Sequence, residues 1–197
     1  MIQDPRLLDA LAGRRSTPAG CLTAPAPDDT TLQRILQAAE SAPDHGGLRP
    51  WRFLVIRDNA LDRLGEVFVE AYRRRVPEAT EANLERERLR ALRPPLIVAA
   101  IARVDPGHAK IPEIEQLLAA GAATHQVVLA SAALGFGVVW LTGERVYDAH
   151  VQSALGLSAD ERLIGLVNIG TRKESAPANG RKRQAAPLDF WEGPGDR

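Results

Sequence analysis

One stretch of this sequence limits the possible folds more than any other. Residues 117–135, LLAAGAATHQVVLASAALG, are apolar on nearly every side of a helix. They form the core of a helix that we expect over about residues 113–134, with Gly135 supplying the left-handed residue that ends it. A helix that is apolar all round has to be covered all round, and its small Ala, Gly and Ser side chains let other elements approach closely. The sequence therefore predicts a central, buried helix.

Four apolar runs of strand length are distributed around that helix. They are WRFLVI, LIVAAIA, VVWLTG and LIGLVNIG, at residues 51–56, 96–102, 138–143 and 163–170. Helical patterns separate most of them. The pattern at 78–93 is mostly charged, with Leu84, Leu89 and Leu92 as a thin apolar stripe, so we expect that helix on the surface. Strands alternating with helices favour a layered α/β or α+β arrangement, and 197 residues suit one domain spanning 1–197.

Composition excludes several classes of function. The formal net charge is zero, so nucleic acid is not an expected partner, and no stretch is long and apolar enough to span a membrane. Neither GxGxxG nor GxxxxGK[ST] occurs, and the four histidines show no metal-ligand spacing. The amino terminus lacks the basic-then-apolar order of a signal peptide, so we expect a cytoplasmic protein.

The sequence GRRST follows directly after a short helical pattern. Arg14, Arg15 and Ser16 could grip a phosphate through charge-assisted hydrogen bonds. Basic residues at a helix C-terminus can also simply complement the helix dipole, and taken alone this second interpretation is favoured.

A second mixed stretch, SAPDHGGLRPWRFLVI at residues 41–56, interrupts a helical pattern and leads into a strand. Its glycines at 46 and 47 allow close backbone approach to a ligand, and His45 can stack or hydrogen-bond. The alternative is a plain helix-to-strand turn, with an exposed His45 and with Trp51 in the core.

A third stretch, GFGVVWLTG, ends a strand at Trp140, Leu141 and Thr142. Residues at strand ends often line pockets, although a tryptophan on an apolar strand is more often a core residue. Cys21 has no histidine nearby in the sequence and is expected to be structural. His125, inside the apolar helix, is expected to be a hydrogen-bonded core group.

Taken together and in this order, these pieces resemble the nitroreductase family of flavin enzymes. The matching motifs are RRS, APDHGGLRPWRFLVI, KIPEIEQLLAAGAATHQ, LGFGVVWLTG and IGLVNIGT, and they cover most of residues 7–172. The variant with PDH before PW is typical of a small, single-domain subgroup. The resemblance implies an α+β fold, a three-layer α-β-α sandwich with a mostly antiparallel sheet. It also implies a homodimer with two FMN molecules at the subunit interface.

The resemblance further implies a set of cofactor-binding residues: Arg14, Arg15, Ser16, His45, Trp140, Leu141, Thr142 and Arg183. The first three would bind the FMN phosphate and ribityl chain, and residues 140–142 would lie along the isoalloxazine. His45 would reach a flavin bound mainly by the other subunit. Arg181 and Arg183 are candidates for the basic residue that many relatives use near the carboxyl end, with a solvated basic run as the open alternative.

The sequence departs from the family pattern at three places. Gly47 stands where most relatives carry Asn, Arg49 where they carry Gln, and the pair His125-Gln126 where Gln-Asn is common. The resemblance does not extend to the tail at residues 172–197. That tail ends in Leu188, Phe190 and Trp191, which we expect to pack on the partner subunit.

The activity implied is that of an FMN-dependent oxidoreductase in which NAD(P)H reduces the flavin and a nitroaromatic, quinone or related acceptor reoxidises it by a ping-pong cycle. No side chain is expected to be an indispensable acid or base, since the flavin carries the chemistry. One alternative is a flavin-binding dimer with little redox turnover, or a family member with a different flavin reaction. A dimeric interaction protein that has lost the cofactor is another.

Overall fold

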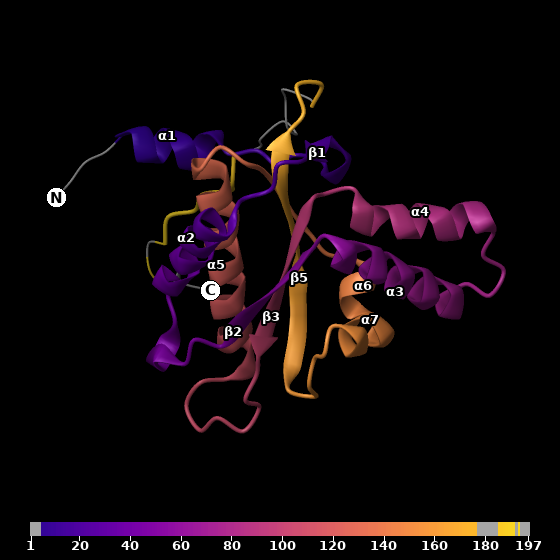
Figure 1. Cartoon of the computed structure of the whole chain (residues 1–197). Coiled ribbons are helices and arrows are strands. Elements are labelled where there is room, and N and C mark those ends of the chain that lie inside the picture. The colour runs from indigo at the N-terminus through magenta and orange to yellow at the C-terminus, as the bar shows by residue number, and fades with distance from the viewer. Residues whose placement is uncertain (1–4, 177–184, 192, 194–197) are drawn as a thin grey trace.

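The structure, a computed structural model, describes residues 5–176, 185–191 and 193 (Figure 1). Its elements follow one another along the chain in this order: α1 (Pro5–Gly13), η1 (Ala19–Cys21), β1 (Leu22–Thr23), α2 (Asp29–Ala38), η2 (Ala39–Ser41), η3 (His45–Gly47), β2 (Trp51–Arg57), α3 (Asn59–Arg75), α4 (Glu81–Leu92), β3 (Leu96–Arg103), α5 (Glu113–Ala133), β4 (Gly137–Leu141), α6 (Glu144–Tyr147), α7 (Ala149–Ala154) and β5 (Glu161–Arg172).

The strands form a single antiparallel sheet. Its order is β1-β5-β3-β2, and β4 lies off this path and pairs with β5. Every pairing between described strands is antiparallel, which confirms the predicted antiparallel sheet. All four strands expected from the sequence are present. The two-residue strand β1 was not expected, because so short a segment carries no periodic signal of its own.

Helices cover both faces of the sheet and make three layers (Figure 1). On one face α2 and α5 pack on Val98 and Val167, and on the other α3 and α7 pack on Ile97 and Leu166. These residues alternate along β3 and β5, as neighbouring residues of a strand point to opposite faces. β3 is buried along nearly its whole length because both its faces are covered. The expected α+β sandwich is confirmed.

α5 is buried along one side and exposed along the other. Its inward side includes Ala123 and Val127, which are fully buried, whereas Ile114 and Leu118 are exposed. The expectation that this helix is covered all round therefore does not hold within one chain. His125 also lies on the exposed side, so its assignment as a core group was wrong. Apolar periodicity shows that a surface needs covering but not whether the same chain covers it.

α4 presents a different face to the core than its leucines suggest. Leu84, Glu87 and Ala91 are buried, while Leu89 and Leu92 of the predicted stripe are exposed. α4 packs on α3 over Gly65, where a β-carbon would lie only 3.2 Å from the carbonyl oxygen of Arg88. The two helices thus approach closely, and this turns a glutamate rather than a leucine inward.

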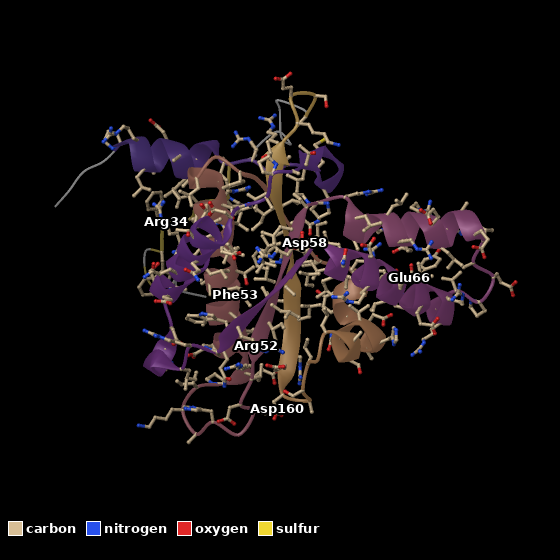
Figure 2. The ribbon with its side chains drawn as sticks, viewed as in Figure 1. Arg34, Arg52, Phe53, Asp58, Glu66 and Asp160 are labelled. Carbon is tan, nitrogen blue, oxygen red and sulfur yellow. The ribbon has the colours of Figure 1, made fainter. Side chains whose placement is uncertain are left out.

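An ion pair at one end of the sheet makes folding stability depend on pH. The carboxylate of Glu161 accepts hydrogen bonds from Arg52 Nε at 2.6 Å and from Arg52 Nη2 at 2.7 Å. Figure 2 labels Arg52 and Asp160, the residue before Glu161. Mainly through these bonds, Arg52 lowers the pKa of Glu161 from 4.5 to about 2.

Because the folded-state pKa lies below the unfolded one, the pair stabilises the protein above pH 4.5, and this stabilisation is lost as the pH falls toward 2. We expect Glu161→Gln to cost up to about 3 kcal/mol at neutral pH and to flatten the loss of stability below pH 4.5. Urea unfolding at several pH values measures this. Parallel pH profiles for the variant and the unaltered protein would contradict the assignment.

Candidate functional site

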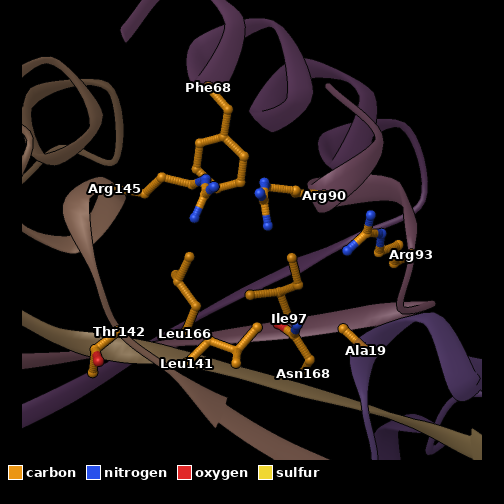
Figure 3. A pocket seen from close by; sticks show the side chains of 10 residues that line it. All are labelled: Ala19, Phe68, Arg90, Arg93, Ile97, Leu141, Thr142, Arg145, Leu166 and Asn168. Carbon is orange, nitrogen blue, oxygen red and sulfur yellow. The ribbon is translucent and has the colours of Figure 1, made fainter. Parts of the chain in front are cut away.

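A small pocket of about 50 Å³ lies between the sheet and the helices α3, α4 and α6 (Figure 3). Its floor is formed by Ile97, Leu141 and Leu166, and the ring of Phe68 lies on the opposite side. The remaining lining residues are Ala19, Arg90, Arg93, Thr142, Arg145 and Asn168. The pocket therefore combines an apolar floor with three guanidinium groups, an arrangement suited to a planar, partly apolar molecule with anionic or carbonyl oxygens.

Asn168 lies at the bottom of this pocket, in the middle of β5. Its side chain is almost fully buried, and its Oδ1 accepts no hydrogen bond from any described residue. Leaving a buried acceptor unsatisfied costs about 1–3 kcal/mol, so such atoms are uncommon in folded proteins. The geometry suits a ligand that brings an N–H or O–H donor to this position.

Two of the three arginines, Arg90 and Arg145, are held by the buried carboxylate of Glu87. Glu87 Oε1 accepts from Arg90 Nε at 3.0 Å, and Glu87 Oε2 accepts from Arg145 Nε at 2.8 Å. Arg145 also lies over the ring of Phe68, 5.7 Å from its centroid. Burial lowers the pKa of Arg145, and the hydrogen bond to Glu87 opposes this effect. Arg93, at the mouth of the pocket, is exposed.

The strand end predicted to bind the cofactor divides between the two faces of the sheet. Leu141 and Thr142 line the pocket. Trp140 points to the opposite face, packs among the residues around α5, and donates from Nε1 to the carbonyl of Ile164 at 3.4 Å. Its indole lies against Gly165, where a β-carbon would be 2.0 Å from Nε1. Alternation along β4 thus separates Trp140 from Leu141, and Thr142 follows the end of the strand.

The segment Arg14–Ser16 follows the end of α1 and lies near one end of the pocket. The next residue, Thr17, donates its backbone N–H to the carbonyl of Val138 at 2.9 Å, which ties the segment to the start of β4. Ala19, three residues after Ser16, lines the pocket. Three residues of chain span at most about 11 Å, so Ser16 lies within that distance of one residue of the pocket wall.

Arg14 and Arg15 make different contacts. Arg14 Nη1 donates to Ser16 Oγ at 3.5 Å, so the two groups lie side by side on the surface. Arg15 Nη1 donates to the carbonyl oxygens of Ala12 and Gly13 at 2.9 and 3.0 Å, which are bonds to the end of α1. The interpretation as a helix-end cation therefore describes Arg15 in this structure, while Arg14 and Ser16 face outward together.

His45 lies elsewhere in the chain, near the start of α5. Its Nδ1 is 2.6 Å from Oε2 of Glu115 on the first turn of that helix. The loop needs glycine at position 46, because φ is +74° and a β-carbon would meet Ile111 at 2.6 Å. Glu115 and Ala133 are 18 residues apart, about 27 Å along a helix, so within one chain His45 lies far from Arg14.

Sequence reasoning missed four polar lining residues: Arg90 on α4, Arg93 directly after it, Arg145 on α6 and Asn168 on β5. Only Asn168 carried a usable signal, as the one polar residue in the apolar run LIGLVNIG. Arg181 and the predicted phosphate ligand Arg183 lie outside the described residues. Within the part of the chain that the structure describes, no cluster of metal-ligating side chains occurs, and no helix is long and apolar enough to cross a membrane.

Comparisons with known proteins assign the chain to a family. Residues 11–171 match the nitroreductase family. Two bacterial proteins named "Putative NAD(P)H nitroreductase" are similar in sequence. One is from Haemophilus influenzae, 41% identical over 155 residues, covering 79% of this chain and 83% of its relative. The other is YdjA from Escherichia coli, 32% identical over 164 residues, covering 83% and 87%.

A solved structure shows the same fold. It is a mutant form of the FMN and NADPH-dependent nitroreductase NfnB from Sphigopyxis sp. strain HMH, with a TM-score of 0.73 at 21% identity, covering 94% of this chain and 98% of that one. The chain thus belongs to the nitroreductase family, and the resemblance seen in its motifs is confirmed.

Proposed function

We propose that this protein is a cytoplasmic, homodimeric, FMN-dependent oxidoreductase that uses NAD(P)H to reduce nitroaromatic, quinone or related acceptors. One observation carries the proposal. A pocket beside the Arg14–Ser16 segment combines guanidinium groups with a buried acceptor, Asn168 Oδ1, that no described residue satisfies. Membership of the nitroreductase family supports the same reaction class.

The residues present fit FMN. Arg14 and Ser16 lie together on the surface and would bind the phosphate. Leu141 and Leu166 offer an apolar floor to a planar ring, and the guanidiniums of Arg90 and Arg145 would face its carbonyl oxygens. Asn168 Oδ1 would accept from an N–H at the ring edge. In this arrangement Arg90, Arg145 and Asn168 each gain a partner of the matching type.

When bound, FMN supplies hydride and electron transfer, from NAD(P)H to the acceptor, with the two substrates using the site in turn. The chain's own residues bind and orient. Arg90 and Arg145 stabilise negative charge on the pocket contents, because guanidiniums in a partly buried site are weakly screened. Leu141 and Leu166 exclude water from the floor. None of these roles needs a side chain that gains or loses a proton.

Three groups of exposed apolar residues favour a dimer. Two of them lie on the helices α1 and α5, and the third lies in the tail. α1 buries no side chain, and its Leu7, Leu8 and Leu11 are exposed. α5 exposes Ile114 and Leu118. A single chain that presents this much apolar surface is typical of a subunit, since obligate dimers bury about 2,000 Å² or more in total.

The two parts of the proposed cofactor site, Arg14 and His45, lie at positions that favour the same dimer. Arg14 lies near the carboxyl end of α5 and His45 near its amino end, about 27 Å apart. A twofold axis that passes through the exposed side of α5, perpendicular to the helix, would place the two copies of this helix antiparallel. Each His45 would then approach the Arg14 end of the other chain. The dimer thus accounts for a cofactor site that one chain leaves divided.

The third group is the tail, which would complete the interface. Leu188, Phe190 and Trp191 are each more than 75% exposed. β2 is an edge strand in the described sheet, and a groove beside it is lined by Leu36, Trp51 and Phe53 among others. We place the partner's tail on this edge, where its apolar side chains would be covered.

The test starts from the absorbance of the purified protein. We expect a yellow preparation with flavin absorbance, bleached by NADH or NADPH without air and restored by a quinone or a nitroaromatic compound. A ping-pong cycle gives parallel double-reciprocal lines when both substrates are varied. Retained FMN without bleaching would favour the flavin-binding protein without turnover. A colourless protein that does not take up added FMN would overturn the proposal.

Asn168 allows a test that separates cofactor binding from folding. Asn168→Leu removes an unsatisfied buried acceptor, so we expect the apo-protein to gain about 1 kcal/mol of stability. FMN should bind about tenfold more weakly, because one hydrogen bond is lost. Thermal melts of the apo-protein and fluorescence titration with FMN measure the two effects. Lower stability with unchanged FMN affinity would show that Asn168 serves the fold.

A further inference from the structure

The most unusual group beside the pocket is a buried carboxylate that does not line it. Glu87 is 3% exposed and lies on the inner face of α4. Its two oxygens divide between two arginines of the pocket wall, Arg90 from the same helix and Arg145 from α6. Both Nε and Nη2 of Arg145 approach Oε2 at 2.8 Å. Glu87 is therefore the shared counter-ion of two cationic lining residues.

The pair with Arg145 also joins two parts of the site. α6 begins at Glu144, immediately after the turn at Thr142 and Gly143. Gly143 has φ +99°, a conformation that favours glycine. The bond from Arg145 to Glu87 therefore ties the Leu141–Thr142 wall of the pocket to α4, which carries Arg90. One carboxylate holds both sides of the pocket in position.

Glu87 also lowers the positive charge of the pocket wall. The wall carries three guanidiniums, Arg90, Arg93 and Arg145, and Glu87 cancels part of their positive potential. Because the pair is partly desolvated, solvent screens this potential less than it would at an exposed surface. A bound redox group feels the difference, since added positive charge favours its reduced, more negative state.

We infer that Glu87 is a positioning residue that sets the reduction potential of the pocket's cofactor, by fixing Arg90 and Arg145 and by cancelling part of their charge. The inference rests on the proposed function, because it takes FMN as the bound group. It predicts the direction of each effect. Loss of the carboxylate charge raises the reduction potential of the cofactor, and loss of a guanidinium charge lowers it.

The experiment measures the midpoint potential of the FMN-loaded full-length protein by equilibration with a reference dye. We expect Glu87→Gln to favour the reduced over the oxidised flavin about tenfold more than the unaltered protein does. For a two-electron couple this is about +30 mV. Arg145→Gln should shift the potential by a similar amount in the opposite direction, and the double variant should return close to the starting value.

The opposite signs separate an electrostatic role from a structural one. Both single variants break the same buried ion pair, so damage to the fold would move both potentials in one direction. Glu66→Gln is the matched control, because Glu66 pairs with Arg88 between the same two helices but at the exposed surface. We expect no shift for it. If Glu87→Gln folds too poorly to hold FMN, Glu87→Asp, which keeps the charge, should rescue binding and leave the potential unchanged.

Three results would overturn the inference. These are shifts of the same sign in both single variants, no shift in Glu87→Gln, or an equal shift in Glu66→Gln. All three require a protein that binds FMN and is reduced, so they leave the proposed function intact. An unaltered protein that binds no FMN overturns the proposed function, and the inference with it.

Discussion

Mixing two inactive variants is expected to restore about a quarter of the wild-type activity, because a twofold dimer has two equivalent sites that each use both chains. One variant carries Arg14→Ala, which removes the proposed phosphate-binding cation, together with Arg15→Ala at the end of α1. The other carries His45→Trp. The His45 side chain is 60% exposed within its own chain, so the larger ring leaves the fold intact and blocks only the partner's pocket.

Refolding the two together yields heterodimers in about half of the molecules. One site of each heterodimer then carries both defects, and the other is intact. Each variant refolded alone is the control, and native mass spectrometry of the mixture reports heterodimer formation. Heterodimers without activity would mean that His45 serves its own chain. A monomeric protein in solution would contradict the dimer itself.

Replacing Arg14 by Ala is expected to weaken FMN binding roughly ten- to hundredfold, as charge-assisted hydrogen bonds contribute about 1.5–3 kcal/mol. The stability of the apo-protein should change little, because Arg14 is not fully buried and follows α1, a helix that buries no side chain. Fluorescence titration with FMN measures the first effect and thermal unfolding the second. The loss should shrink at high salt, which screens exposed charges.

Arg34→Ala is a suitable control for this measurement. Arg34 lies on the exposed side of α2, and Figure 2 labels it. It carries the same charge away from the pocket, so its loss should leave FMN affinity unchanged. Equal affinities for Arg14→Ala and the unaltered protein would remove Arg14 from the phosphate site.

Periodicity predicts the four longer strands to within two residues, because a buried strand needs an unbroken apolar run and these runs end at Pro, Gly or charged residues. The family assignment succeeds for a different reason. Each motif is short, but five of them in a fixed order are specific, and together they imply the α+β sandwich found here.

The contents of the pocket were beyond reach of the sequence because they depend on long-range packing. Glu87 and Arg145 are 58 positions apart, and His45 and Glu115 are 70 positions apart. No local pattern indicates such pairs. α4 shows the difficulty best: counting apolar residues selects Leu89 for the core, whereas the close approach of α3 and two guanidinium partners bury Glu87 instead.

The contact between Trp140 and Gly165 has a consequence for the order in which this site can change. A β-carbon at position 165 would lie 2.0 Å from the indole nitrogen and 2.9 Å from the carbonyl oxygen of Leu141. Any larger residue at 165 would displace the indole and, with it, the strand end that carries Leu141 and Thr142. A smaller residue at 140 removes the worst of these clashes, so it has to come first. The two substitutions can therefore occur in one order only. Among descendants of this sequence, a side chain at 165 should occur only where the tryptophan at 140 has already been lost.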